Sequence, residues 1–279
     1  MADQEHLDLL RQGVEVWNRW REERREWEQR ESFMIVDNVP IEKPYPHLVD
    51  LSGANLEKRE LRHINLQGAN LRGTRFVRAV LKEANLSQAD LDGAVFNQAN
   101  MESADLSNAR VRNASMADAN LWRSKLREAD LQGTSFVHAF LAEADLQRAN
   151  LMKADFTLAV LHRANLHEAS VWSTIFGDVD LSEVQGLETL RHWRPSLIDI
   201  RTLARSSGRI PEVFLRQAGI ESAIIPSLLA LFHPYHGYAA WWGSEEPPVS
   251  PWLTTERPKE PPRPLDESRE ENLFDDTLE

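Results

Sequence analysis

The chain has 279 residues, of which 42% are hydrophobic and 27% are charged. This is the composition of an ordinary globular protein of one or two domains. The sequence holds no run of eighteen apolar residues and no apolar stretch at its polar N-terminus, so we expect neither a membrane span nor a signal peptide. The absence of cysteine excludes disulfides, thiol catalysis and cysteine-ligated metal sites.

The net charge of -12 is unevenly distributed along the chain. Residues 50–181 carry 17 acidic and 15 basic side chains, a net charge of -2, whereas residues 244–279 carry 11 acidic and 4 basic side chains, a net charge of -7. Most of the acidity therefore belongs to the C-terminal segment. Direct nucleic-acid binding is not expected from this distribution.

Residues 1–36 are expected to form an N-terminal helical cap. Apolar side chains recur there at three- or four-residue spacing and make one stripe, formed by Leu7, Leu10, Val14, Trp17 and Trp20. We expect this helix to lie on or beside the segment that follows, and a partner-binding helix is the alternative. Residues 37–48 hold three prolines and are predicted to be an extended lead-in.

Residues 49–183 repeat every five residues. Each fifth position from Leu51 to Leu181 is apolar, and these 27 positions hold 18 Leu, 5 Phe, 2 Met and 2 Val. The positions two residues earlier hold 19 Ala. Neither a helix nor a simple strand has a period of five. We therefore expect the large and the small residue of each unit to point inward, and the Asp or Asn before each central residue to bond the turn backbone.

A second period, which returns at every fourth unit, predicts that four units make one coil. All five Phe residues of the central positions fall in one such column, and Met116 takes the remaining place. We expect a structural core ladder of stacked side chains made by Phe76, Phe96, Met116, Phe136, Phe156 and Phe176. A third and longer period relates Gly73 and its successors to Gly133 and its successors, which suggests a duplication of three coils.

The motif Ala-Asp/Asn-Leu-X-X, as in Ala84-Asn85-Leu86 and Ala149-Asn150-Leu151, resembles the pentapeptide-repeat family. The resemblance implies an all-β solenoid, a right-handed quadrilateral β-helix of about seven coils. At ordinary strand spacing such a stack is roughly 30–35 Å long. Both of its ends expose unpaired backbone, so we expect helical caps at the N- and C-terminal sides.

Apolar residues at outward positions are the candidate protein-binding patch. They fall near one corner of the coil and comprise Val77, Val80, Val137, Phe140, Leu158 and Val160. A contiguous exposed apolar patch usually marks an interface, either with another protein or with a second copy in a homodimer. The alternative is that a terminal helix covers it. Trp122 and Trp172 are separate outward aromatic residues that raise the same question.

The period ends after Leu181, and residues 184–243 are expected to form a C-terminal helical cap of short helices. Ser196 is the predicted N-cap of the first, Pro211 suits the first turn of the second, and a third covers roughly residues 222–231. Residues 244–279 hold seven of the fourteen prolines and many acids, so we expect a disordered tail. Its last eight residues could instead fold on a partner.

Both flanks resemble bacterial pentapeptide-repeat proteins that carry a Toll/interleukin-receptor-type domain. The similar segments are Gly13–Arg21, Asp50–Leu56, Ser196–Leu203 and Ile210–Gly219. Such domains are linked to NAD cleavage or signalling. The sequence departs after Leu231, where we expect no room for a further domain. The resemblance therefore implies a sensor or scaffold half. Because the sequence shows no export signal, we expect a cytoplasmic location in a bacterium.

No catalytic constellation stands out, so we expect no enzyme activity, no cofactor and no metal. The sequence has no phosphate-binding glycine loop and no nucleophile elbow. His233 and His236 lack further ligands nearby, and His138, His162 and His167 fall on outward repeat positions.

Three functions remain open at this point. The first is a non-enzymatic protein–protein interaction scaffold, whose partner the sequence does not name. The second, implied by the family resemblance, is a DNA-mimic inhibitor of an enzyme such as gyrase, although a mimic needs an acidic stripe. The third is an accessory subunit of an NAD-cleaving signalling enzyme.

Overall fold

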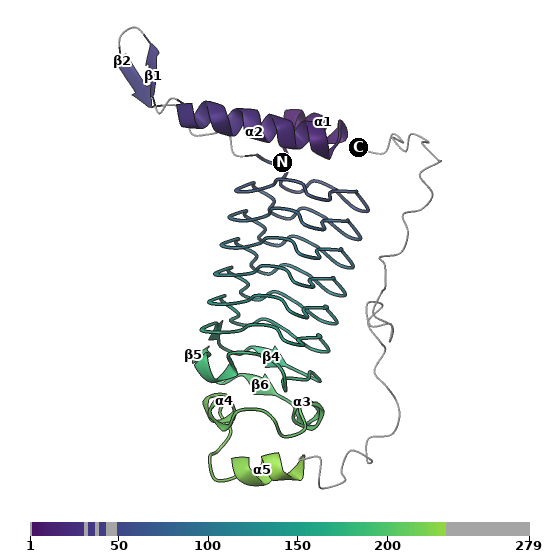
Figure 1. The fold of residues 1–279 in the computed structure, drawn as a ribbon, viewed down its shortest axis with the longest axis vertical. Helices are drawn as coiled ribbons and strands as arrows, with labels where there is room; N and C mark the ends of the chain where they lie inside the picture. The colour runs from purple at the N-terminus through teal and green to yellow at the C-terminus, as the bar shows by residue number, and fades with distance from the viewer. Residues whose placement is uncertain (1, 31–32, 37–38, 43–48, 233–279) are drawn as a thin grey trace. The chain divides into compact units, whose positions relative to one another are not determined.

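The computed structural model describes residues 2–30, 33–36, 39–42 and 49–232, and the side chains of residues 25–48 are outside the description. Parallel bridges join the units to the fourth unit after them, from Asp50↔Asn70 to Asn165↔Gln185, with one gap in the series, between Val160 and Asp180. Four units therefore complete one turn, and the coil has four sides. Figure 1 shows these coils stacked one above another.

Backbone hydrogen bonds explain why a five-residue unit makes one side of the coil. Ala84 N donates to Leu81 O at 3.0 Å and closes the turn, while Leu81 N donates to Asn100 O at 2.7 Å on the next coil. The second turn residue is left-handed throughout the regular coils, as at Glu83 with φ of 56°. Its N–H donates to the next coil, to Glu102 O at 2.9 Å. The bond offsets part of the roughly 1–2 kcal/mol cost of this conformation.

The interior of the stack is filled by the central residues and the small residues two places before them. All the central residues are buried, and the ladder column holds face-to-face rings. The ring centroids are 4.9 Å apart for Phe76 and Phe96, 5.0 Å for Phe136 and Phe156, and 5.7 Å for Phe156 and Phe176. Their planes differ by at most 6°.

Asp and Asn at the bridging position bond the following turn. The carboxylate of Asp50 accepts from Ser52 N at 2.8 Å, and Asp105 accepts from Ser107 N at 2.9 Å. The same contact recurs on every side of the coil, for example from Trp122 N to Asn120 at 3.1 Å. These side chains therefore have a structural role, because they satisfy a turn N–H that the ladder leaves free.

Two helices contact the first coils. They are α1 (Gln4–Arg11), capped by Asp3, and α2 (Val14–Arg30). The expected single helix is broken because Gly13 takes a φ of 107°. Trp17 is fully buried, and its Nε1 donates to Asn65 O at 2.8 Å.

Two short strands lie at residues 33–36 and 39–42, where the sequence pattern predicted none. Strand β1 (Phe33–Val36) pairs antiparallel with β2 (Val39–Glu42). Strand β1 lies in the segment expected to be helical and β2 in the expected lead-in. The run Phe-Met-Ile-Val of β1 is the local signal, because β-branched and aromatic residues favour strands.

The coil becomes irregular where the repeat ends. Strand β3 (Ser170–Val171) pairs with β5 (Arg191–His192), and β4 (Ile175–Phe176) pairs with β6 (Leu197–Ile198), all in parallel. Both pairings span slightly more chain than the bridges of the regular coils. The short 3-10 helix η1 (Leu187–Thr189) takes up the extra length.

Three short helices follow, and Figure 1 shows them beyond the last coils. They are α3 (Ile200–Arg205), α4 (Glu212–Gln217) and α5 (Ile225–Leu231). Ser196 was expected to cap the first helix, and this expectation is wrong. Asp199 is the N-cap, because its carboxylate accepts from Thr202 N at 2.8 Å, whereas Ser196 is buried. None of the helices in the described part of the chain is long and apolar enough to cross a membrane.

Candidate functional site

The predicted patch occupies one side of the coil and the corner that precedes it. Phe140 and Val160 are bridging partners on adjacent coils, in the middle of that side. Val137 and Leu158 lie at the preceding turns, and all four side chains are partly exposed. We call Val137, Phe140, Leu158 and Val160 the apolar face.

Val77 and Val80 are not continuous with the apolar face. The bridges run from Val80 through Asn100 and Asn120 to Phe140, so two coils lie between the two groups. The intervening surface is polar, and Asn120 Nδ2 donates to Asn100 Oδ1 at 3.3 Å. The six predicted residues therefore form two apolar groups at the same side of the coil, three coils apart, and the second group is the larger.

Phe140 and Val160 occupy positions where other coils have a turn-bonding Asp or Asn. On the same side of the coil, Asn120 accepts from Trp122 N and Asp180 accepts from Ser182 N, at 3.1 and 2.9 Å. A Phe or Val side chain has no acceptor for this contact. Apolar residues at these two positions thus forgo a local bond and leave apolar surface in water.

The terminal helices attach to the two ends of the stack. At the first coils, Asn18 Nδ2 donates to His63 O at 2.9 Å. At the last coil, the Thr202 hydroxyl donates to Phe176 O at 2.7 Å, and Leu181 N donates to the Ser206 hydroxyl at 3.0 Å. These anchoring bonds lie on coils other than those of Phe140 and Val160.

A ladder of alternating charge borders the apolar face at its other edge. Arg123 Nε donates to Glu143 Oε2 at 2.8 Å, and Arg163 Nε lies 3.4 Å from Glu183 Oε2. A hydrogen bond from Arg123, together with one from the Trp122 side chain, holds the pKa of Glu143 below its usual value. Arg123 also stacks over the Trp122 ring, 4.4 Å from its centroid, so this outward tryptophan is engaged within the chain.

The C-terminal end of the stack carries exposed apolar side chains that the sequence pattern did not predict. Trp193, Leu197 and Ile200 are 68%, 62% and 55% exposed. They lie beyond the last regular unit, where no period marks a residue as inward or outward. The outward Trp172 contacts two cations within the chain, with Lys153 Nζ 5.4 Å and the Arg194 guanidinium carbon 5.7 Å from its ring centroid.

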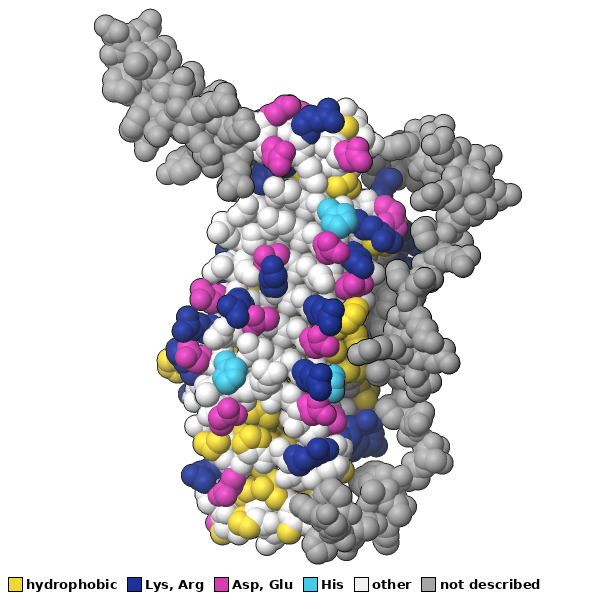
Figure 2. Space-filling model, viewed as in Figure 1, with side chains coloured by type: hydrophobic (Ala, Val, Ile, Leu, Met, Phe, Trp, Pro, Cys, Tyr) yellow, Lys and Arg dark blue, Asp and Glu magenta, His cyan; other side chains and the backbone are white. Residues whose placement is uncertain are grey.

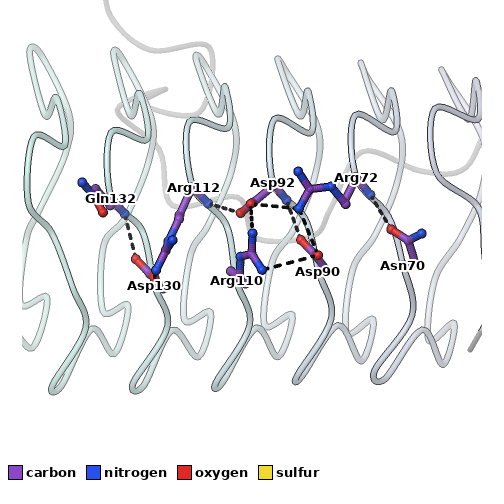
Figure 3. A network of polar contacts seen from close by, with 8 residues as sticks. All are labelled: Asn70, Arg72, Asp90, Asp92, Arg110, Arg112, Asp130 and Gln132. Atoms are coloured by element: carbon purple, nitrogen blue, oxygen red, sulfur yellow. Dashed lines mark hydrogen bonds and ion pairs between the residues drawn. The ribbon is translucent and has the colours of Figure 1, made fainter.

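Charged residues on the opposite side of the coil neutralise one another. Figure 3 shows this network: Arg72 bonds Asp92 at 3.1 Å, Arg110 pairs with Asp92, and Arg112 Nε donates to Asp130 at 2.6 Å. The hydrogen bond that Arg110 donates to the Asp92 carboxylate raises the pKa of Arg110. Figure 2 likewise shows acidic and basic side chains interspersed over the face in view.

The histidines that the sequence singled out lie among different partners. No three His, Asp or Glu side chains among the described residues gather in an arrangement that could hold a metal ion. His162 lies 3.4 Å from Glu183, and His167 lies 3.2 Å from the Thr189 hydroxyl. His192 packs edge-on against Phe214, and burial lowers its pKa. The pair His233 and His236 lies outside the described residues.

Comparison with known proteins agrees with the geometry. The family model "Pentapeptide repeats" matches eight copies between residues 50 and 178. No curated protein matches the chain.

Solved structures that resemble the chain include three pentapeptide-repeat or related proteins. A trypsin-treated variant of QnrB1, a plasmid-mediated fluoroquinolone resistance protein, is 19% identical over 61% of this chain and 90% of its own, with a TM-score of 0.31. HetL of Nostoc sp. strain PCC 7120, involved in heterocyst differentiation regulation, is 24% identical over 54% and 91%, with a TM-score of 0.19. Rfr23 of Cyanothece 51142 is 27% identical over 44% and 88%, with a TM-score of 0.18.

The five-residue unit, the four-sided coil and the family match lead to the same assignment. Proteins with these repeats are typically non-enzymatic structural or interaction proteins, and the repeats imply a right-handed quadrilateral β-helix. Residues 50–178 of this chain belong to the pentapeptide-repeat family.

Proposed function

We propose that this protein is a non-enzymatic protein–protein interaction scaffold that binds its partner through the apolar face, with the terminal helices acting as caps. The observation that carries the proposal is the placement of Phe140 and Val160 on adjacent coils at positions that elsewhere hold turn-bonding Asp or Asn. Bacterial signalling or defence is the setting that the flanks imply.

The rigidity of the stack favours such a role. Every unit of the apolar face is held to its neighbouring coils by backbone bonds, such as Phe140 N to Ala119 O at 2.9 Å and Leu141 N to Val160 O at 2.8 Å. A preformed surface loses little conformational entropy when a partner binds. Burying a Phe side chain fully contributes about 1.5–3 kcal/mol, so Phe140 is the expected central anchor.

Charge arrangement disfavours the DNA-mimic alternative. A mimic requires a continuous acidic stripe, whereas Asp92 and Asp130 are matched by arginines of neighbouring coils, and the ladder of Glu143 and Glu183 is matched in the same way. We expect the protein not to inhibit gyrase in a supercoiling assay. For the accessory-subunit alternative, we expect no consumption of NAD by the protein.

A pair of matched variants tests the proposed function. Phe140→Asp places at this position the residue type that the repeat accepts best, so the fold should persist. Met152→Asp makes the same apolar-to-acid change at a partly exposed turn position, two sides of the coil away. Immobilised wild type, Phe140→Asp and Met152→Asp are used to capture proteins from a lysate of the native host, followed by quantitative mass spectrometry.

The expected result is a protein that wild type and Met152→Asp retain and Phe140→Asp loses at least tenfold. Circular dichroism melting of the three proteins shows whether they remain folded. Equal capture of every protein by wild type and Phe140→Asp would contradict the assignment of the binding surface.

A further inference from the structure

The apolar face and the charged ladder beside it form one surface, and this surface is complementary to the same surface of a second copy. We propose that the occupant of the apolar face is a second copy of this chain, lying antiparallel to the first. The inference rests on the proposed function, because it uses the same surface, and it names the partner. It is carried by the order of four charges along the ladder and by the positions of Phe140 and Val160.

A twofold axis lying in the interface, perpendicular to the stack, fixes which residues meet. Such an axis sets each column of outward residues against the same column of the second copy and reverses the order of the coils. When the axis passes midway between the coils of Phe140 and Val160, Phe140 of each chain faces Val160 of the other. His138 then faces Leu158, and the small residues Ala117 and Gly177 face each other.

The ladder selects this register over its neighbours. Along one edge the order is Arg123, Glu143, Arg163, Glu183, with Arg123 paired to Glu143 at 2.8 Å and Arg163 to Glu183 at 3.4 Å. With the axis midway between the two coils, Arg123 faces Glu183 and Glu143 faces Arg163 of the second copy.

Moving the axis by half a coil spacing, onto the coil of Phe140, brings like charges together. Glu143 would then face Glu143, and Arg123 would face Arg163. If the axis moves by a further half spacing, to midway between the coils of Asn120 and Phe140, Arg123 of each chain faces Glu143 of the other. Phe140 then faces the polar Asn120. One register therefore satisfies both the charges and the apolar side chains.

One acidic pair remains in this arrangement, where Asp118 faces Asp178. Asp178 is already neutralised within its own chain, since Arg201 lies 3.3 Å away and Arg205 also pairs with it. The shared surface spans four coils, about 19 Å at ordinary strand spacing. An interface of this size is at the small end of specific contacts, so we expect a concentration-dependent dimer with a Kd in the micromolar range.

Sedimentation velocity of the full chain between about 1 and 100 µM tests the dimer. Wild type and Met152→Asp should shift from the monomer mass to twice that mass across this range, and Phe140→Asp should stay monomeric. A wild type that is still monomeric at the highest concentration would overturn the inference, and so would a dimer that Phe140→Asp leaves intact.

Cysteine pairing tests the register, because the chain has no cysteine of its own. Arg123→Cys and Glu183→Cys are prepared as single variants and oxidised alone or mixed. The antiparallel register predicts a disulfide-linked dimer in the mixture only. Equivalent positions lie three coils apart, about 14 Å, and a disulfide needs Cα atoms within about 7 Å.

Strong cross-linking of Arg123→Cys with itself, and none in the mixture, would refute the register. The failure of this inference is distinguishable from failure of the proposed function. If wild type is monomeric while Phe140→Asp still loses a lysate protein that Met152→Asp retains, the apolar face binds a different protein. If wild type is monomeric and Phe140→Asp captures the same lysate proteins as wild type, the apolar face is not a binding surface.

Discussion

Leucine substitutions in the phenylalanine column measure how much ring stacking stabilises the coil. Phe156 and Phe76 are both fully buried, but their neighbours differ. Phe156 stacks on rings at both sides, with centroid distances of 5.0 and 5.7 Å, whereas Phe76 stacks on Phe96 alone, at 4.9 Å, and has Leu56 in the same column on the preceding coil.

Phe156→Leu should therefore destabilise more than Phe76→Leu. Each change shares a repacking cost of about 1 kcal/mol, because a buried apolar side chain is exchanged for a slightly smaller one. Phe156→Leu removes two stacked pairs and Phe76→Leu removes one, and each pair contributes roughly 0.5–1.5 kcal/mol beyond area burial. The expected difference between the two free energies of unfolding is therefore about 0.5–1.5 kcal/mol.

Guanidinium denaturation followed by circular dichroism and tryptophan fluorescence measures this difference. The two signals should give one midpoint and an unchanged slope, so that the midpoint shift converts to free energy. If the two variants lose equal stability, or Phe76→Leu loses more, the rings fill volume in the column without a stacking contribution.

Three further predictions concern the core, the N-terminal contact and acid stability. Phe136→Asp should abolish the cooperative melting transition, since it places an unpaired charge among fully buried side chains; an unchanged melting curve would contradict the inward position. Trp17→Phe leaves the Asn65 carbonyl without its indole donor and should cost about 1–3 kcal/mol in a denaturation experiment, and no loss would mean that water replaces the bond. Burial lowers the pKa of His192 in the folded protein below that of the unfolded chain, so the unfolded chain binds the proton more readily and stability falls as the pH drops through about 6.5 toward the folded pKa. His192→Phe should show a smaller loss of Tm than wild type between pH 7.5 and 5.5, and equal losses would assign the acid sensitivity to other groups.

The sequence alone determined the repeat and its four-sided coil. In a solenoid each unit contacts only the units beside it and those one coil away, so a period of one unit and a period of four units translate directly into hydrogen bonds. The bridge Asn85↔Asp105 and the buried column from Phe76 to Phe176 have the spacing of four units that the sequence shows. The outward position of Phe140 follows from the same two periods.

The tertiary structure decided what happens where the period stops. Asp199, not Ser196, is the N-cap of α3, because the lengthened pairings of the last coils bring Asp199 to accept from Asp178 N at 3.1 Å. Gly13 divides the N-terminal helix so that Trp17 reaches the first coils.

Likewise, no pattern in the sequence predicted that Trp193 and Leu197 are exposed. Outside the repeat, a residue's environment depends on contacts between segments that no periodicity relates. The distance of three coils between Val80 and Phe140, by contrast, follows from the period of four units. Local spacing determines structure where every contact is local or one coil away, and three-dimensional packing decides the ends.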